Sequence, residues 1–310
     1  MHTRDDKLYP ITSLCKLFGV TKQAYFKDVE HGKVLKLSQE AFALDFIKRI
    51  RAKDSGIGGR KLWYMYIREF QGNTPLGRDR FEALIDKYGL KVRTKMRVPR
   101  TTDSHHGLPL YPNLIKTFIP TGAYQLWVSD ITYIPIWITD EEYRFCYLSL
   151  IMDGYTREIM GYQVGATLET YYCMLALQKA LEKSDSRNAD LSHLIHHSDR
   201  GIQYASAQYV SILSKRGITL SMTEDGNPKD NPQAERINST IKNELFKGKQ
   251  FHSILEVRLE TDKAVEFYNT QRPHMSIDLM APMQVLERTG EIKKKWKSYR
   301  DRAIKNLAPE

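Results

Sequence analysis

Long apolar runs are absent from this sequence of 310 residues, since none approaches the roughly 18 residues that a membrane-spanning helix needs. The residues after Met1 are charged and polar, so a secretory signal segment is not expected either. The only three cysteines, Cys15, Cys146 and Cys173, lie far apart and form no Cys-x-x-Cys pair. A disulfide framework and a cysteine zinc site are therefore excluded, and we expect a cytoplasmic protein.

Internal repeats are also lacking, which excludes a repeat architecture. Hydrophobic residues make up 41% of the sequence, so the chain has enough apolar side chains to bury a sizeable core. A chain of this length and composition predicts two or three folded domains rather than a disordered protein.

Acidic residues are scarce in the first part of the chain. Residues 1–120 carry a net charge of +11, whereas the remaining residues carry −1, and the whole chain carries +10. A second basic cluster, KKKWKSYR, occupies residues 293–300. Such asymmetry is typical of proteins that bind nucleic acid, although a basic protein with solvated charges is the alternative.

Residues 9–29 are predicted to form two short helices around a turn at Gly19, with Thr21 as the N-cap of the second. This pattern fits a helix-turn-helix, whose second helix enters the major groove of DNA, and it equally fits a plain helical hairpin.

Two further helices are predicted over residues 58–70 and 77–90, with Gly89 as the stop of the second. The following segment, 91–100, holds five basic residues and no acid, and Arg93, Lys95, Arg97 and Arg100 could follow DNA phosphates as an extended arm. A solvated linker is the alternative, because the next residues, 101–113, have linker composition.

The pattern after residue 121 predicts the element order βββαβαβα. This order indicates an α/β fold with a mixed sheet and helices on its faces. The strands are expected at 124–137, 143–155, 158–164, 194–199 and 219–223, and the three helices of this order at 167–184, 206–218 and 254–271. A further helix is expected at 232–246, before the last one.

Three carboxylates have unusual places in this pattern. Asp130 lies inside an apolar strand, where its burial is unfavourable, and Asp199 lies at the end of the fourth strand, the kind of position where α/β sites assemble. Glu235 falls in the first turn of a helix that Asn231 can cap and that Pro232 begins. On its own Glu235 is favoured there by the helix dipole and needs no function.

Together, three such carboxylates could hold a pair of Mg²⁺ ions, because hard cations prefer carboxylate oxygens. Two ions can activate the attacking oxygen and stabilise the leaving oxygen in phosphodiester transfer. A glycosidase pair is the competing use of carboxylates, but it explains neither the third carboxylate nor the basic first part.

Four blocks of the sequence resemble the transposases of bacterial insertion sequences of the IS-three group. Their core is similar to retroviral integrase and belongs to the ribonuclease-H-like DDE superfamily. The blocks are LWVSDITYIP around Asp130, HHSDRGIQY around Asp199, DGNPKDNPQAERINSTIKNE around Glu235, and FYNTQRPHMSIDLMAPMQV at 267–285. Asp199 and Glu235 leave 35 residues between them, as in this family. The resemblance covers roughly residues 9–288.

The resemblance implies a five-stranded ribonuclease-H-like core in 121–287, with Asp130, Asp199 and Glu235 as catalytic, metal-binding residues. It implies that Lys242 contacts the DNA end and that Asn238 touches substrate or orders its helix. His197 could hydrogen-bond near the metals or be a packed strand histidine. Asp153 is expected in a turn. The closing segment is expected to buttress the core with Tyr268, Asn269, Arg272, Pro273 and His274.

The remaining parts are expected to be a helix-turn-helix-like unit in 1–54, a second helical DNA-binding unit with a basic arm in 55–100, a linker in 101–120 and a basic tail in 288–310. The sequence departs from the family in two places, with Lys229 where relatives often have an aromatic residue and Pro232 where a small residue is usual. It lacks the His-His-Cys-Cys module of integrases. It also lacks initial heptads, so it resembles a second-frame product, for which an upstream-frame helix-turn-helix protein is a possible partner.

The implied activity is Mg²⁺-dependent cleavage and transfer of DNA strands at the ends of an insertion sequence, with Mn²⁺ as a substitute cation. The implied partners are the terminal inverted repeats, target DNA and at least one further copy of the chain, because two DNA ends must be paired. A catalytically silent DNA-binding regulator and a ribonuclease-H-like nuclease are the alternatives.

Overall fold

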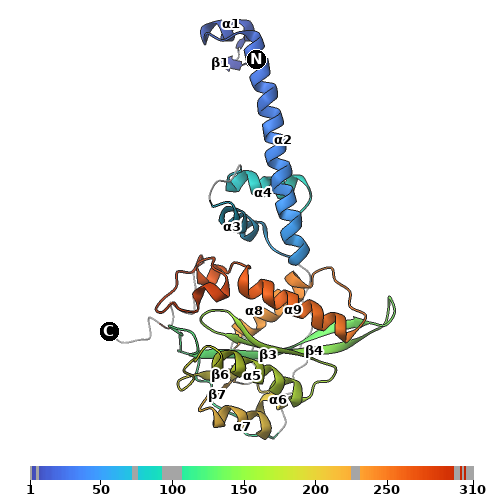
Figure 1. Cartoon of the computed structure of the whole chain (residues 1–310), viewed down its shortest axis with the longest axis vertical. Coiled ribbons are helices and arrows are strands. Elements are labelled where there is room, and N and C mark those ends of the chain that lie inside the picture. Colours follow the sequence, from blue (N-terminus) through green and yellow to red (C-terminus); the bar gives the residue numbers. More distant parts are fainter. Residues whose placement is uncertain are drawn as a thin grey trace.

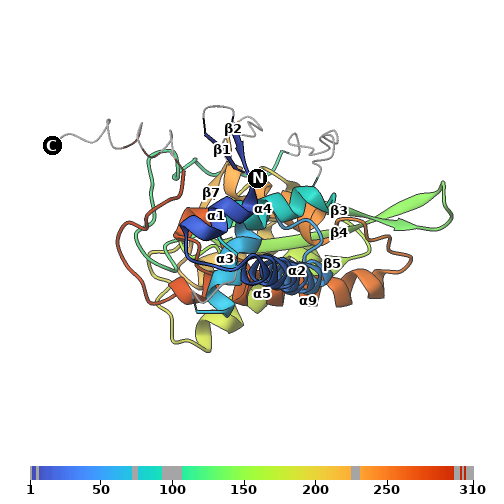
Figure 2. The same cartoon turned by 90° about the horizontal axis from the view of Figure 1, so that it is seen from above.

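The computed structural model describes residues 2–4, 7–71, 76–92, 107–224 and 231–296, together with Asp301 and Ile304. A long helix, α2, rises away from a small helical group, which in turn stands on an α/β body (Figure 1). In the view along α2 the helix is seen end-on, and the hairpin of the two longest strands extends beyond the body (Figure 2). The basic residues Arg93, Lys95, Arg97 and Arg100, and Lys229 as well, lie outside the described residues.

The first element is a short antiparallel hairpin of β1 (His2–Arg4) and β2 (Lys7–Tyr9), which the sequence patterns do not predict. Helix α1 (Ile11–Leu17) follows and ends in a turn at Gly19, whose φ of +68° is the left-handed conformation that glycine adopts most easily. Helix α2 then begins as expected, because the Thr21 hydroxyl accepts a hydrogen bond of 3.0 Å from the amide of Ala24.

The prediction of a short second helix is wrong, because α2 continues from Lys22 to Lys53. Nothing in this stretch can end a helix, since it has no proline and no turn dipeptide. A single glycine, Gly32, weakens a helix by about 1 kcal/mol but does not break it. The expected pair of short helices is therefore a short helix followed by a rod.

The lower half of α2 packs against α3 (Gly59–Glu69) and α4 (Arg78–Lys87). Their shared core contains Phe46, Tyr66 and Phe81, which are at most 2% exposed. The Phe46 and Tyr66 rings meet edge to face, with 5.2 Å between their centroids. A hydrophobic cluster thus crosses the expected boundary between residues 54 and 55. We call α2, α3 and α4 the helical module.

The α/β body contains the expected five-stranded mixed sheet, in the order β5-β4-β3-β6-β7. The first three strands form the antiparallel meander, and the last two run parallel to β3. The strands are β3 (Leu126–Trp137), β4 (Tyr143–Asp153), β5 (Ile159–Gly165), β6 (Ile195–Ser198) and β7 (Thr219–Met222).

Helices cover both faces of this sheet (Figure 1). Side chains alternate along β3, so Trp127 packs with α5 and α7, whereas Val128 packs with α8 and α9 on the other face. These helices are α5 (Thr170–Asp185), the short α6 (Ile202–Ala205), α7 (Ala207–Lys215), α8 (Pro232–Thr240), the π-helical turn η2 (Ile241–Leu245) and α9 (Ile254–Thr270). The 3₁₀ turns η3 (Met275–Ile277) and η4 (Pro282–Val285) follow.

In the described part of the basic tail, Lys295 forms an ion pair of 2.6 Å with Asp278. Residues 297–300 of that cluster lie outside the described residues. Across the described ranges, no helix combines the length and the apolar character that crossing a lipid bilayer requires.

Candidate active site

Asp130 and Asp199 come from neighbouring parallel strands. In the register of β3 and β6, Val128 is the partner of His197. Asp130 and Asp199 each lie two residues after this pair. Because the strands are parallel, both carboxylates lie beyond the same end of the β3–β6 pairing. Because side chains alternate with a period of two, Asp130 shares the sheet face of Val128, which is the face that α8 and α9 cover.

The loop after β6 holds the Asp199 side chain in place. The amide of Gly201 donates a hydrogen bond of 3.0 Å to Asp199 Oδ1. A Cβ atom at position 201 would lie 3.0 Å from the same oxygen, so only glycine allows this close approach without displacing the carboxylate. The Arg200 Nε atom donates to the carbonyl of Thr223 at 2.7 Å, which ties the loop to the end of β7.

Glu235 is exposed in the first turn of α8, where the sequence places it. Asn231 stands at the N-cap position, but its side chain makes no capping bond. Instead, Asn231 Nδ2 donates to the carbonyl of Ser129 at 3.1 Å, so this side chain fastens the start of α8 to β3 beside Asp130. On its inner face the helix packs into the hydrophobic core through the buried residues Ala234 and Ile237.

Asn238, one turn after Glu235, is only 7% exposed. Its Nδ2 atom donates a hydrogen bond of 2.8 Å to Asp130 Oδ2. Of the two expected roles, contact with substrate or ordering of the site, this geometry serves the second. The other oxygen, Asp130 Oδ1, accepts from the amide of Ile131 at 2.9 Å.

The charges of Asp199 and Glu235 both act on the Asp130 carboxylate. Burial, the charge of Asp199 and, less strongly, that of Glu235 together raise the pKa of Asp130 to about 7, although the hydrogen bonds from Ile131 and Asn238 lower it. A carboxylate with two acidic neighbours is unfavourable without a counter-charge, and a bound cation supplies one.

Lys242 lies in η2, which continues α8. Burial lowers the pKa of Lys242, and the charge of Asp130 raises it, so this ammonium group is within electrostatic reach of the carboxylates. The sequence predicts the proximity but not the π-helical turn, because one wide turn leaves no mark on the apolar periodicity. Such turns are frequent at functional sites.

No group of three His, Cys, Asp or Glu side chains among the described residues is arranged as a ready metal site. The segment before α8, residues 225–230, lies outside that description. The donor chemistry nevertheless fits Mg²⁺, since Asp130, Asp199 and Glu235 offer only carboxylate oxygens and no nitrogen or sulfur. The raised pKa of Asp130 is the second observation that fits a cation at this place.

Two other polar residues of the sequence patterns lie in structural positions. His197 is buried on β6, and its Nδ1 atom is 2.9 Å from Ser221 Oγ on the next strand. Asp153 ends β4, and its Oδ1 atom accepts from the amides of Tyr155 and Thr156, both at 2.9 Å, so it is a turn residue.

The closing segment packs against the core rather than entering the site. Asn269 bonds both backbone groups of Ile159, with Oδ1 accepting at 2.9 Å and Nδ2 donating at 3.0 Å. The Tyr268 ring meets the His274 ring edge to face. Arg272 reaches Glu244 of η2 with two hydrogen bonds, of 2.8 and 2.9 Å. Sequence reasoning missed Glu244, for no local pattern marks it.

The integrase core domain family matches residues 120–228 and again residues 216–282. The insertion element IS600 uncharacterized 31 kDa protein of Shigella sonnei is 33% identical over 279 residues, which cover 89% of this chain and 98% of that protein. The transposase for insertion sequence element IS629 of Shigella sonnei is 31% identical over 69% of this chain and 68% of that protein. Among solved structures, the HTLV-2 integrase catalytic core domain in complex with magnesium has 15% identity and a TM-score of 0.39, covering 54% of this chain and 98% of that chain.

Proposed function

The chain belongs to the transposases of insertion sequences that carry an integrase core domain, and on this premise we propose that it cleaves and joins DNA strands at the ends of its element with Mg²⁺. The observation that supports the proposal is geometric: Asp130 and Asp199 lie at matching positions of neighbouring parallel strands, and Asn238, on the helix of Glu235, donates to Asp130 Oδ2 at 2.8 Å.

Asp130, Asp199 and Glu235 are the residues that would hold the metal ions. When bound, such ions activate an attacking oxygen and stabilise the charge on a leaving oxygen. In the proposed reaction a water or a 3′-hydroxyl attacks a phosphodiester in line, and the leaving 3′-oxygen takes the electron pair of the broken P–O bond. No covalent bond to the enzyme forms.

The other residues of the site have supporting roles in this proposal. Asn238 keeps the Asp130 carboxylate from rotating, through its hydrogen bond of 2.8 Å. Gly201 does the same for Asp199 through its amide. Lys242 provides a positive charge for a DNA phosphate beside the carboxylates.

The DNA duplex is the proposed substrate and partner. The net charge of +11 on residues 1–120, which contain the helical module, supports contact between this part of the chain and the phosphate backbone. The proposal includes the arm around Arg93, Lys95, Arg97 and Arg100, and at least two copies of the chain, because a reaction on two element ends needs two active sites.

The test is strand cleavage and strand joining on DNA that carries the element's own ends, with Mg²⁺ and with Mn²⁺. We expect Asp199→Ala and Glu235→Gln to lower both activities by a factor of about 10³ or more, as for groups that stabilise the transition state directly. The matched control is Glu266→Gln on the exposed side of α9, which should change neither.

Full activity of folded Asp199→Ala or Glu235→Gln protein would make the assignment wrong. Hydrolysis without joining would identify a ribonuclease-H-like nuclease. DNA binding without cleavage under either cation, unchanged by the triad substitutions, would identify a silent DNA-binding regulator.

A further inference from the structure

The helical module meets the α/β body at the end of the helix that carries Glu235. Hydrogen bonds join the loop after α2, the first half of α3, η2 and the segment after α9 at this place. Four charged side chains, Asp54, Lys61, Glu244 and Arg272, lie in this contact, and we call them the junction cluster.

Glu244 is the centre of the junction cluster. Besides its two bonds to Arg272, it accepts from Lys61 Nζ at 3.1 and 3.3 Å. The Asp54 side chain is fully buried, with its Oδ2 atom 3.8 Å from Arg272 Nε. Two residues of the module and two of the body thus form a single buried group of charges.

The junction cluster is electrically coupled. Although burial acts in the opposite direction, the charges of Arg272 and Lys61 hold the pKa of Glu244 below its usual value. Burial and the charge of Glu244 raise the pKa of Asp54. Removal of one member of such a group leaves the others as uncompensated buried charges, so the contact responds strongly to the position of each partner.

Backbone contacts fasten the same point. A π-helical turn does not satisfy all of its carbonyl groups within the helix. The Glu244 carbonyl accepts from the amide of Gly56 at 3.0 Å, and the Lys247 carbonyl accepts from Ser55 Oγ at 2.5 Å. The loop between α2 and α3 therefore completes the hydrogen bonding at the end of the active-site helix.

Gly56 makes this close contact possible. A Cβ atom at position 56 would lie 2.4 Å from Glu244 Cα and 2.7 Å from its carbonyl oxygen, both of which are backbone atoms that cannot rotate away. Gly58, two residues later, has no atom within 4 Å of its corresponding position. These two glycines are thus a matched pair for an experiment.

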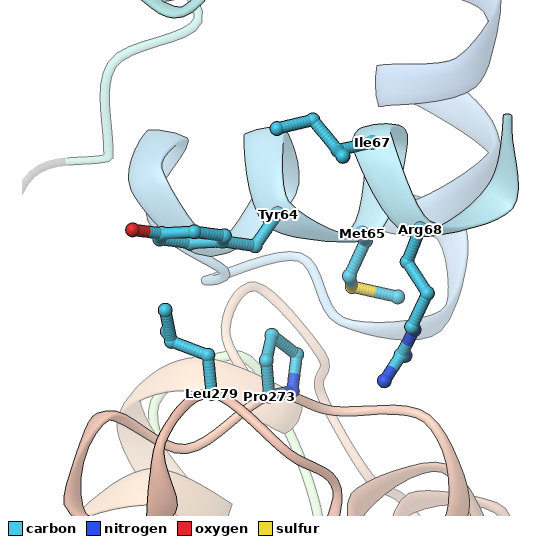
Figure 3. A pocket seen from close by; sticks show the side chains of 6 residues that line it. All are labelled: Tyr64, Met65, Ile67, Arg68, Pro273 and Leu279. Carbon is cyan, nitrogen blue, oxygen red and sulfur yellow. The ribbon is translucent and has the colours of Figure 1, made fainter. Parts of the chain in front are cut away.

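The other side of the contact is incompletely filled. A pocket of about 220 Å³ lies between α3 and the segment after α9, lined by Tyr64, Met65 and Arg68 on one side and by Pro273 and Leu279 on the other (Figure 3). Arg68 bridges the gap and donates to the carbonyl of Gln271 at 2.7 Å. Space in a contact permits small displacements that a close-packed core would resist.

We propose that Glu244 is a positioning residue that ties the helical module to the active-site helix, so that the seating of the module sets the placement of Glu235 and Lys242. Lys242 lies in the same π-helical turn as Glu244, and Glu235 lies in the continuous helix before it. A shift of the module moves η2 through Lys61 and Gly56. This inference rests on the proposed strand transfer, and it adds that DNA held by the module acts on the chemistry through the junction cluster.

Single variants of the full chain, including Glu244→Gln for comparison with a double variant, test whether the module positions the active-site helix. Gly56→Ala forces the loop away from Glu244, and Lys61→Met removes the cation of the module while keeping the length of its side chain. Gly58→Ala is the control for the first change. The measurements are DNA affinity, the strand-transfer rate at saturating DNA, and hydrogen exchange of the amides of residues 232–245.

We expect Gly56→Ala and Lys61→Met to lower the rate at saturating DNA about tenfold and to speed exchange across α8 and η2, with DNA affinity changed by less than about threefold. The double variant Lys61→Met with Glu244→Gln should be no slower than the slower single variant, since both changes break the same contact. Gly58→Ala should leave all three measurements unchanged.

A loss of DNA affinity with an unchanged rate at saturation would overturn the inference, because it would make the contact part of DNA binding alone. Unchanged exchange in α8 and η2 would also overturn it. If the unsubstituted chain transfers no strands, the proposed function fails, while the exchange measurement still decides whether the module orders the active-site helix. Lys61→Met, which adds no backbone clash, keeps the test decisive if Gly56→Ala does not fold.

Discussion

Asn238 and Asp130 are joined by a hydrogen bond of 2.8 Å between the side-chain amide of α8 and the carboxylate of β3. One buried amide thus connects the helix that presents Glu235 with the strand that presents Asp130. The bond fixes the distance between two of the three proposed metal-binding elements. It also holds the Asp130 carboxylate in one orientation, which a freely rotating carboxylate would not keep.

Asn238→Ala should lower the strand-transfer rate by a factor of about 10–100, because supporting hydrogen bonds to metal-binding side chains have effects of this size. The Mg²⁺ concentration for half-maximal rate should rise at the same time. Asn243→Ala is the matched control, since Asn243 is exposed on the next turn and bonds only to Ser239 among the described residues. An unchanged Mg²⁺ dependence in Asn238→Ala would contradict the role given to Asn238.

Gly201→Ala should lower the strand-transfer rate about tenfold or more, because the added methyl group would displace the Asp199 carboxylate from which it lies 3.0 Å. The measurement is the rate under saturating DNA, with thermal unfolding as the check on folding. Gly77→Ala serves as control, as no atom lies within 4 Å of its added Cβ. Equal rates for the two variants would show that Asp199 tolerates displacement.

Acid should destabilise the folded protein through His196, which is buried and bonded to Ser129 and Tyr209. Burial and the neighbouring His197 lower the pKa of His196 to about 3, whereas an unfolded histidine has a pKa of about 6.5. Between these values the unfolded chain binds more protons, so the free energy of unfolding is highest above pH 6.5 and falls as the pH decreases, by up to about 1.4 kcal/mol per pH unit.

The measurement for this pH dependence is urea unfolding at a series of pH values between 7 and 4. His196→Gln should reduce the slope of unfolding free energy against pH in that window, because glutamine does not titrate. The exposed His193 gives the control His193→Gln, which should leave the slope as it is. A parallel shift of the curve without a change of slope would mean that other groups cause the acid sensitivity.

Asn269→Ala should lower the free energy of unfolding by about 2–4 kcal/mol, because it leaves two buried backbone groups of Ile159 without their partner. Thr270→Ala, at the next and exposed position, should have a much smaller effect. Urea unfolding of both variants measures the difference. A small loss for Asn269→Ala would show that water or another group replaces the amide.

The α/β body is the part that the sequence predicts best. Its strands are rich in aromatic and β-branched residues and its helices carry apolar faces, so Asp130, Asp199 and Glu235 could be assigned to two strand positions and a first helical turn before any coordinates. The side-chain role of Asn231 could not, since a favourable N-cap residue and a residue that bonds another strand look the same in sequence.

The helical module and the junction cluster show the limit of local patterns. The length of α2 was missed, because only the absence of a stop signal in the sequence indicates it, and an absent signal is weaker evidence than a present one. The contacts of Glu244 with Lys61 and Arg272 join residues far apart in the chain, and only the tertiary fold brings them together. A charged residue in a helix is usually exposed, so the sequence does not indicate that a residue such as Glu244 is largely buried.

The length of α2 also has a consequence for scale. A helix of 32 residues extends about 48 Å, at a rise of 1.5 Å per residue. The lower half of this rod packs against α3 and α4, and the upper half carries α1 away from the body (Figure 1). One turn of B-DNA measures about 34 Å, so under the proposed function a duplex that contacts α1 and is cut beside Asp130 would be engaged at points more than one turn apart. In the proposed complex the rod would set this interval, and each added heptad would lengthen it by about 10 Å, or about three base pairs, while the rotational phase stays nearly unchanged.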